Sequence, residues 1–333
     1  MLLSFVIPHY NLPCALLQRC IESIEALGIK EYGIETVIVD DGSQSPPLWV
    51  TGKYPKANIK VITAGHNGPG AARNRGIEEA KGRYIMFVDA DDYLIANGTM
   101  PVLLDIIERE RPQILRIKQI VHKNGNETVF AQIKKVKQSR TVSGAMFMAN
   151  NNLPGSPCAY IFLRELAIKK EIRFPVNCFH EDEEFNTILH FHALSLIESD
   201  APVYCYCIRA GSTTTNEDQE FKRRRTDDML QAIARIAAFR DSYYEESNNI
   251  QKKAIERKLN TLATDAVMNM LFNGYKTDET YKKCIESLKP LSLYPIPKAS
   301  YSFKYKVFRI FANSKTGIAF LKVLLHSKKP KKQ

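Results

Sequence analysis

The chain has 333 residues, of which 44% are hydrophobic and 25% are charged, an ordinary composition for a soluble globular protein. This length allows one main domain and an appendage. The net charge is +11, and the whole excess lies in residues 287–333, which hold eleven Lys or Arg and no Asp or Glu. Because a nucleic-acid enzyme usually carries basic charge around its site, this terminal placement argues against a nucleic-acid partner.

The cysteine and histidine patterns predict neither disulfides nor a zinc site. The seven cysteines form no Cys-x-x-Cys pair, as expected for a reduced cytosolic protein. Cys205 and Cys207 share one face of a predicted strand, where packing is expected rather than bridging. His190 and His192 lack the spacing of a zinc-binding helix, and the other histidines form no ligand set. The start does not resemble a signal peptide, and no uncharged run reaches the roughly 18 residues that a membrane span needs.

Strand and helix patterns alternate in the first part of the chain. Continuous apolar runs predict strands, and apolar residues at helical spacing predict helices. The expected strands are 2–7, 36–39, 59–63 and 84–88, and the expected helices are 15–27, 69–80 and 100–110. This alternation predicts an α/β fold with a mostly parallel sheet, right-handed crossovers and helices on both faces.

Beyond residue 114 the pattern is less regular. Residues 114–122 and 128–133 predict a hairpin around 124–126, followed by helices near 143–150 and 181–194 and a strand at 202–208. From residue 218 the spacing is helical, over 218–245, 250–273 and 277–288. The predicted boundary lies near 213–216, between an α/β domain, 1–215, and a helical extension, 216–333.

The most informative segment is the fourth predicted strand with the acidic residues behind it. Asp89, Asp91 and Asp92 follow the apolar run 85–88, which delivers them to one point. Clustered carboxylates raise one another's pKa unless a cation neutralises them. Oxygen ligands of this kind suit Mg²⁺ or Mn²⁺ bound to substrate phosphates, whereas a plain acidic turn is the alternative.

Two other predicted strands also end in polar residues, at 8–11 and at 40–43. In an open parallel sheet the carboxyl ends of the strands border the ligand crevice, so the three segments can meet there. Residues 67–76 then predict a helix N-terminus with Arg73 on its exposed face, suited to a diphosphate. This glycine-rich segment completes neither a dinucleotide fingerprint nor a P-loop, and a plain surface arginine is the alternative.

These motifs, in this order, resemble the inverting glycosyltransferases of family 2, which have the glycosyltransferase-A fold. The resemblance covers about residues 1–215 and rests on segments 7–11, 39–43, 68–76 and 87–92. It implies that the first domain is catalytic and transfers a sugar from a nucleoside-diphosphate sugar, with UDP as the expected nucleotide. The expected acceptor is a hydroxyl of a saccharide or a lipid-linked saccharide in surface polysaccharide synthesis.

The resemblance assigns the donor base to the first two strand ends. Tyr10 and Asp41 would contact a uracil-like base, with Asp40 as the alternative to Asp41. Pro8 would shape that pocket, and Arg73 would lie near the base or the diphosphate.

The same resemblance assigns the acidic segment to the ribose and the metal. Asp89 would face the ribose and Asp91 the metal, with Asp92 assisting, and the division among the three stays open. The cation, Mn²⁺ or Mg²⁺, would stabilise the departing nucleoside diphosphate.

An inverting transfer also needs a base that deprotonates the acceptor hydroxyl. Residues 179–185 resemble the family's Glu-Asp-x-x-Phe segment, which implies that Asp182 is the base, with Glu181 as the fallback. The alternative is a helix that carries acidic residues in its first turn because of the helix dipole. Residues 204–213 resemble a later family segment, which implies that Arg209 touches the diphosphate or closes a loop. Segment 155–159 departs from the family pattern, so the acceptor contacts have no assignment.

The basic end predicts a membrane-binding tail. Phe303, Ile310 and Phe311 belong to an apolar stripe, and residues 318–325 form a second apolar segment before the lysines of 328–332. Basic amphipathic helices bind anionic membrane surfaces, which predicts a peripheral protein on the inner face of the cell membrane. The alternative is a terminal helix that packs on its own core.

Two other functions are open at this level. A sugar nucleotidyltransferase would carry a Gly-rich loop with Arg or Lys after the first strand, where residues 8–11 stand instead. A non-catalytic sugar-nucleotide-binding membrane adaptor would not need Asp89, Asp91 and Asp182, which are all present.

Overall fold

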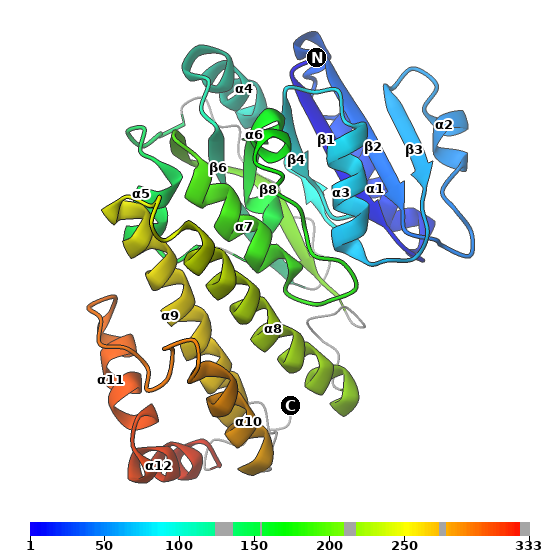
Figure 1. Ribbon diagram of the computed structural model, residues 1–333. Coiled ribbons are helices and arrows are strands. Elements are labelled where there is room, and N and C mark those ends of the chain that lie inside the picture. Colours follow the sequence, from blue (N-terminus) through cyan, green and yellow to red (C-terminus); the bar gives the residue numbers. More distant parts are fainter. Residues whose placement is uncertain (124–135, 154, 210–217, 273–277, 327–333) are drawn as a thin grey trace. The chain divides into compact units, whose positions relative to one another are not determined.

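The computed structural model describes the chain except residues 124–135, 154, 210–217, 273–277 and 327–333 (Figure 1). It forms two compact units. The first consists of Met1–Gly144 and Pro154–Asn216, and the second of Ala145–Leu153 and Glu217–Gln333. The predicted boundary at 213–216, the turn and second strand of the predicted hairpin, and the lysines of 328–332 lie outside the described residues.

One eight-stranded sheet forms the framework of the first unit, in the order β3-β2-β1-β4-β7-β6-β8-β5. The strands are β1 (Leu3–His9), β2 (Ile34–Asp40), β3 (Ile59–Thr63), β4 (Tyr84–Phe87), β5 (Tyr93–Leu94), β6 (Ile114–Lys123), β7 (Tyr160–Leu163) and β8 (Leu196–Ile208). The pairs β1–β2, β1–β4, β2–β3 and β6–β8 are parallel, whereas β7 and β5 pair antiparallel with their neighbours. The predicted α/β fold is confirmed, with a parallel first half and a mixed second half.

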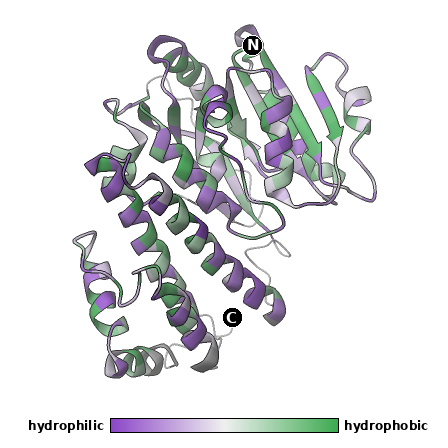
Figure 2. Cartoon of the chain, viewed as in Figure 1, coloured by the Kyte–Doolittle hydropathy of each residue, from purple (hydrophilic) through white to green (hydrophobic). Residues whose placement is uncertain are grey.

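In the first half, β1, β2 and β4 are buried on both faces because helices cover them, whereas β3 at the edge is partly exposed. β1 and β4 are almost wholly buried, and Figure 2 shows these strands mostly in the green of hydrophobic residues. The helices of this unit are α1 (Cys14–Glu25), α2 (Trp49–Lys53), α3 (Pro69–Glu79), α4 (Thr99–Glu110), α6 (Arg164–Lys169) and α7 (Glu181–His192), with short 3-10 turns at Lys30–Tyr32 and Pro157–Ala159. In α1 the apolar residues recur every three or four positions, and this stripe is buried.

α3 packs so closely on β1 that one position requires glycine. A Cβ atom built on Gly76 would lie 2.2 Å from Val6 Cγ1, and the branched valine is stiff. We expect Gly76→Ala to lower the free energy of unfolding by about 1–3 kcal/mol, as overpacking in a core does. Urea unfolding checks this.

Gly52 supplies the matched control, since it lies in α2 with no atom within 4 Å of a built Cβ. Gly52→Ala should leave stability unchanged or raise it slightly, because alanine favours helix. The double variant Gly76→Ala with Val6→Ala should lose less free energy of unfolding than the sum of the losses in the two single variants. Equal stability of the two glycine variants would contradict the close packing.

The second unit is helical. Its helices are α5 (Gly144–Asn150), α8 (Gln219–Tyr243), α9 (Asn249–Phe272), α10 (Asp278–Leu288), α11 (Phe303–Ala312) and α12 (Lys315–His326). α8 begins where the Asp218 side chain accepts a hydrogen bond from Phe221 N, and α11 begins where Ser302 caps Tyr305 N. The predicted helices 218–245, 250–273 and 277–288 are thus confirmed. Within the described parts of the chain, none of the helices has the length and apolar character that crossing a membrane requires.

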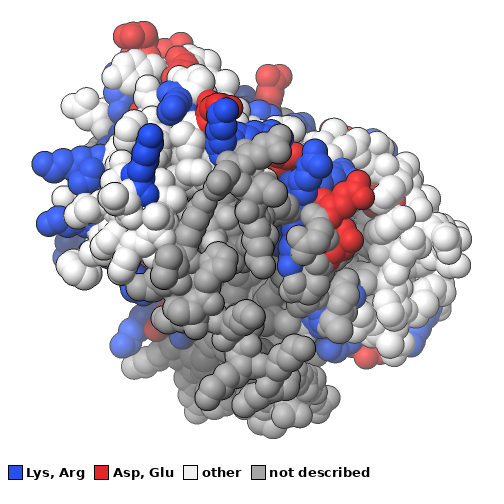
Figure 3. All heavy atoms as spheres, turned by 90° about the horizontal axis from the view of Figure 1, so that it is seen from below, with Lys and Arg blue, Asp and Glu red and all other residues white. Residues whose placement is uncertain are grey.

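Charges of both signs share the described surface. On the face that Figure 3 shows, Lys and Arg side chains lie in separate groups, with Asp and Glu side chains near several of them. This mixture agrees with the balanced composition of residues 1–286, which contain 36 basic and 36 acidic residues.

Candidate active site

Asp40 holds the ends of β1 and β2 together. Its carboxylate is fully buried, with one oxygen 2.9 Å from His9 Nδ1 and the other accepting a hydrogen bond from Ser43 N at 3.1 Å. The Ser43 hydroxyl lies 3.3 Å from the same His9 nitrogen. Asp40 was the alternative base contact; its carboxylate is buried in this turn, and its contact with the base stays a prediction.

Asp41 fixes the loop that leads into α3. Its two oxygens accept hydrogen bonds from Asn67 N and Gly68 N, each at 2.9 Å, and one of them lies 3.0 Å from His66 Nδ1. The carboxylate is buried, so it would bond the base of the sugar donor while it still accepts hydrogen bonds from Asn67 N and Gly68 N. The contact between Asp41 and the base stays a prediction.

An exposed aromatic stack lies beside Asp41. The rings of Tyr10 and His66 are 4.1 Å apart and inclined by 18°, and Tyr10 is 42% exposed. Such a flat face suits stacking of a nucleobase. Tyr10 is one of the predicted base contacts, whereas sequence reasoning missed His66, which belongs to no motif. Pro8 lies in β1 opposite Val39 of β2.

Arg73 is the centre of a buried ionic network. Its Nη1 donates to Glu181 Oε1 and its Nη2 donates to Asp89 Oδ1, both at 2.9 Å, and its guanidinium lies over the Phe174 ring. The residue is only 6% exposed, so the predicted exposed position is wrong. Two carboxylates, one from the segment after β4 and one from α7, hold the guanidinium inside. Arg73 therefore joins the end of β4 to the start of α7.

The three aspartates after β4 lie close enough for the charges of Asp89 and Asp91 to act on Asp92, but each carboxylate has its own hydrogen-bond partner. Asp89 pairs with Arg73. Asp91 accepts a hydrogen bond from Arg209 Nε at 2.6 Å. Asp92 accepts from Tyr204 Oη at 2.6 Å and from Cys207 N at 2.7 Å.

Asp92 lies behind this segment and does not reach solvent. Burial, and then the charge of Asp89, raise its pKa to about 8. Its part as a metal ligand stays a prediction, and in this structure both of its oxygens accept hydrogen bonds from β8. Asp92 instead anchors the acidic segment to β8 and so positions Asp89 and Asp91.

Two arginines surround Asp91. Arg209, predicted to touch the diphosphate, is half-exposed and pairs with the Asp91 carboxylate. Arg19 of α1, which sequence reasoning missed, donates to the Asp91 backbone oxygen at 2.6 Å. Asp89 and Asp91 are partly exposed carboxylates, and each already faces a positive charge. Hard oxygen donors of this kind fit Mg²⁺ or Mn²⁺.

Asp182 lies in the first turn of α7, next to the Arg73 network. Burial, and then the charges of Glu181 and Glu183, raise its pKa to about 8, while Glu183 N donates to its Oδ1 at 2.9 Å. Glu181 is committed to Arg73, so Asp182 suits a general base better than the fallback Glu181 does. The loop before β7 lies close to this point, where Asn186 Nδ2 donates to Gly155 O at 2.7 Å.

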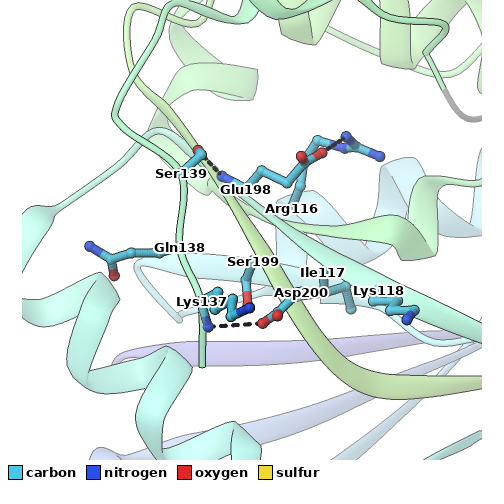
Figure 4. A pocket seen from close by; sticks show the side chains of 9 residues that line it. All are labelled: Arg116, Ile117, Lys118, Lys137, Gln138, Ser139, Glu198, Ser199 and Asp200. Atoms are coloured by element: carbon cyan, nitrogen blue, oxygen red, sulfur yellow. Dashed lines mark hydrogen bonds and ion pairs between the residues drawn. The ribbon is translucent and has the colours of Figure 1, made fainter. Parts of the chain in front are cut away.

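A separate cavity of about 460 Å³ opens at the other end of β6 and β8 and contains none of the predicted site residues (Figure 4). Its charged side chains are partly paired, since Arg116 bonds Glu198 and Lys137 N donates to Asp200 Oδ1 at 2.9 Å. The lining residues are Arg116, Ile117, Lys118, Lys137, Gln138, Ser139, Glu198, Ser199 and Asp200.

The sheet, with acidic residues at the end of β2 and after β4, matches solved structures of the glycosyltransferase-A fold. Residues 1–349 of Staphylococcus aureus TarS, in complex with UDP-GlcNAc, match with a TM-score of 0.71 at 19% identity, over 98% of this chain and 91% of that one. The mannosyltransferase PcManGT from Pyrobaculum calidifontis, in complex with GDP-Man and Mn²⁺, matches with a TM-score of 0.57 at 14% identity, over 98% and 88%.

The chain belongs to glycosyltransferase family 2, since the model of Glycosyl transferase family 2 matches residues 4–170. An uncharacterized glycosyltransferase of Haemophilus influenzae is 31% identical over 55% of this chain and 70% of its own length. The poly(ribitol-phosphate) beta-glucosyltransferase of Bacillus spizizenii is 28% identical over 63% of this chain, which spans only 32% of that enzyme. The protein is therefore a glycosyltransferase.

Proposed function

We propose that this glycosyltransferase transfers a sugar, with inversion, from a UDP-sugar to a hydroxyl of a saccharide or lipid-linked saccharide during synthesis of a cell-surface polymer. The observation that carries the proposal is the Arg73 bridge, which joins Asp89 at the end of β4 to the α7 turn that holds Asp182. This bridge supports the proposal because it links the expected donor contact Asp89 to a helical turn whose Asp182 carboxyl group, with a pKa of about 8, suits a general base. Relatives named as polymer glycosyltransferases support the class of acceptor.

Each side chain then has a task that its position allows. Tyr10 and His66 stack on the base, and Asp182 takes the proton of the attacking hydroxyl. Arg209 pairs with Asp91 in this structure, and a bound diphosphate offers its guanidinium a second anionic partner. Asp91, with Asp89 beside it, would hold Mn²⁺ or Mg²⁺, which supplies Lewis-acid stabilisation of the leaving diphosphate. Family membership favours this transfer over the nucleotidyltransferase alternative.

Thermal unfolding with a panel of nucleotide sugars tests the donor. UDP-sugars with Mn²⁺ should raise the melting temperature, because a ligand at 100 times its Kd stabilises the fold by about 2.7 kcal/mol. His66→Ala should weaken this stabilisation, whereas Trp49→Ala, a change of aromatic residue in α2, should not. Stronger stabilisation by GDP-sugars or CMP-sugars than by UDP-sugars would contradict the proposed donor.

We also propose that the enzyme binds the inner face of the cell membrane through α11 and α12. Phe303 and Ile310 of α11 are 80% and 56% exposed, and Phe320 of α12 is 51% exposed, while the opposite side of α11 buries Tyr305 and Ala312. α11 thus packs on its own unit with one side and presents apolar side chains on the other. Exposed lysines lie among these side chains, which suits an anionic lipid surface.

Sedimentation with phosphatidylserine vesicles tests this surface. Changing Phe303, Ile310 and Phe320 together to Ser should reduce vesicle binding by at least about tenfold, because burying each large apolar side chain contributes roughly 1.5–3 kcal/mol. Leu194→Ser, which removes an exposed apolar side chain of the first unit, is the matched control and should not change binding. Undiminished sedimentation of the triple variant would contradict membrane docking at this surface.

A further inference from the structure

One histidine and two cysteines meet on the edge of the sheet although they are far apart in sequence. His122 of β6 lies opposite Cys207 of β8 in the parallel register, and Cys205 is two residues earlier on the same face. The His122 ring nitrogen and the two sulfur atoms all lie within 4.8 Å of one another. In the described part of the chain, no other group of three His, Cys, Asp or Glu residues offers ligand atoms this close.

The histidine has one nitrogen left over. Its Nδ1 lies 3.2 Å from Tyr93 Oη, whereas its Nε2 is buried and has no hydrogen-bond partner among the described residues. A buried polar atom without a partner is rare, because it costs free energy. In metal sites one histidine nitrogen binds the ion while the other bonds an outer partner, and His122 has one nitrogen with a partner and one without among the residues that the structure describes.

A positively charged side chain lies beside one of the two cysteines. Arg19 Nη2 lies 3.4 Å from Cys207 Sγ, where it can donate a hydrogen bond to a thiolate. His122 and Cys207 are only partly buried, which leaves an ion a path from solvent.

We propose that His122, Cys205 and Cys207 bind one Zn²⁺ ion at this edge of the sheet. Zinc takes neutral imidazole and thiolate ligands in tetrahedral geometry, with a water in the position that three protein ligands leave open. Bonds of about 2.0 Å to nitrogen and 2.3 Å to sulfur hold the ligand atoms about 3.5–3.8 Å apart, so side-chain rotations of about an ångström close the site. Two thiols lose their protons as Zn²⁺ binds, and the charge of the ion is balanced by two thiolates.

The ion would strengthen the back of the active site. Cys207 N donates to the Asp92 carboxylate, and Arg19 joins Cys207 Sγ to the backbone oxygen of Asp91. Zinc at Cys207 therefore fixes the strand on which the acidic segment rests. The sequence predicted no zinc site because the three residues come together only when β6 pairs with β8. The sequence has no Cys-x-x-Cys spacing that would indicate such a site.

Metal content and Co²⁺ substitution test the site in the full-length protein. Protein dialysed against Zn²⁺ and then buffer should hold one zinc per chain by mass spectrometry, and Co²⁺ should give thiolate-to-cobalt charge-transfer absorption. Competition with a chromophoric chelator should show that Cys207→Ser binds Zn²⁺ at least about 100-fold more weakly, since even outer partners of a metal site contribute 10–100-fold. Binding should release two protons per zinc in weakly buffered solution.

Two variants separate this site from other zinc ligands. Cys14→Ser removes an exposed thiol, and Asp91→Asn alters the proposed Mn²⁺ or Mg²⁺ site; both should keep full zinc affinity. Circular dichroism of zinc-free Cys207→Ser shows whether the variant is folded, and His122→Ala provides a second test of the same ligand set. Zinc affinity unchanged in Cys207→Ser and His122→Ala, or lost in Asp91→Asn, would overturn the proposal whatever the sugar donor is.

Discussion

Replacing Asp182 by asparagine is expected to lower the rate of sugar transfer by about 10²–10⁴-fold, the usual contribution of a general base. The variant should still bind the donor, because Asp182 serves the acceptor hydroxyl and asparagine keeps the size of the side chain. Single-turnover transfer measures the loss, and thermal stabilisation by the donor measures the binding. Glu184→Gln, in the same helical turn, is the matched control and should keep its activity.

The raised pKa of Asp182 predicts how activity depends on pH. The base must be ionised to accept a proton, so kcat/KM of the wild type should rise with pH and level off above about 8. The variant should lose this rise together with its activity. A pH profile of the wild type that is flat between 6 and about 9 would contradict the assignment of Asp182 as the base.

The same pKa gives a stability effect of opposite sign. The folded state holds the Asp182 proton up to pH about 8, while the unfolded chain releases it near the ordinary value of 3.8. The folded state therefore binds more protons between these values, and its stability falls as pH rises through this window. An asparagine side chain does not ionise in this window, so Asp182→Asn should be more stable than the wild type at pH 9. The pKa of Asp92 is raised in the same way, so the stability of Asp182→Asn should still fall with rising pH, but less than that of the wild type.

The outline of the parallel half of the sheet could be predicted because its strands are apolar runs, and β1, β2 and β4 are mostly buried. β3 has the predicted bounds, and the strands before it differ only at their ends. β7 was missed because its four residues are all apolar. So short an apolar run shows neither the alternation of a strand nor the spacing of a helix, and it fits both. β5 contains only two residues, and no periodicity exists at that length.

Most residues of the candidate site stand in motifs that the sequence shows, but the partners of these residues could not be predicted. Asp89, Asp91 and Asp92 are neighbours in the chain, yet a tight turn with Asp92 N bonded to Asp89 O sends their side chains in different directions. Arg73 follows glycine and alanine at a helix start, which favours an exposed position. It is buried because Glu181, 108 positions away, provides its second carboxylate. Local patterns carry no information about such pairs.

Arg73→Met is expected to lower the free energy of unfolding by about 3–5 kcal/mol, because removing one partner of a buried ion pair leaves the others uncompensated. Methionine keeps much of the side-chain volume, so the loss reports charge and hydrogen bonding more than packing. Urea unfolding gives the value. Arg75→Met on the same helix is the matched control, because Arg75 is exposed and its surface pairs with Glu78 and Glu79 contribute less than about 1 kcal/mol.

A second substitution distinguishes the loss of the ion pairs of Arg73 from a loss of packing. In Arg73→Met with Glu181→Gln, the carboxylate stranded on α7 becomes neutral, so the double variant should regain part of the stability that Arg73→Met loses. Asp89 keeps some access to solvent and can be hydrated, which makes Glu181 the costlier of the two carboxylates to leave alone. Equal stability of Arg73→Met and Arg75→Met would show that the bridge does not hold α7 to β4. Activity lost in the double variant despite regained stability would show that Arg73 also orients the donor side of the site.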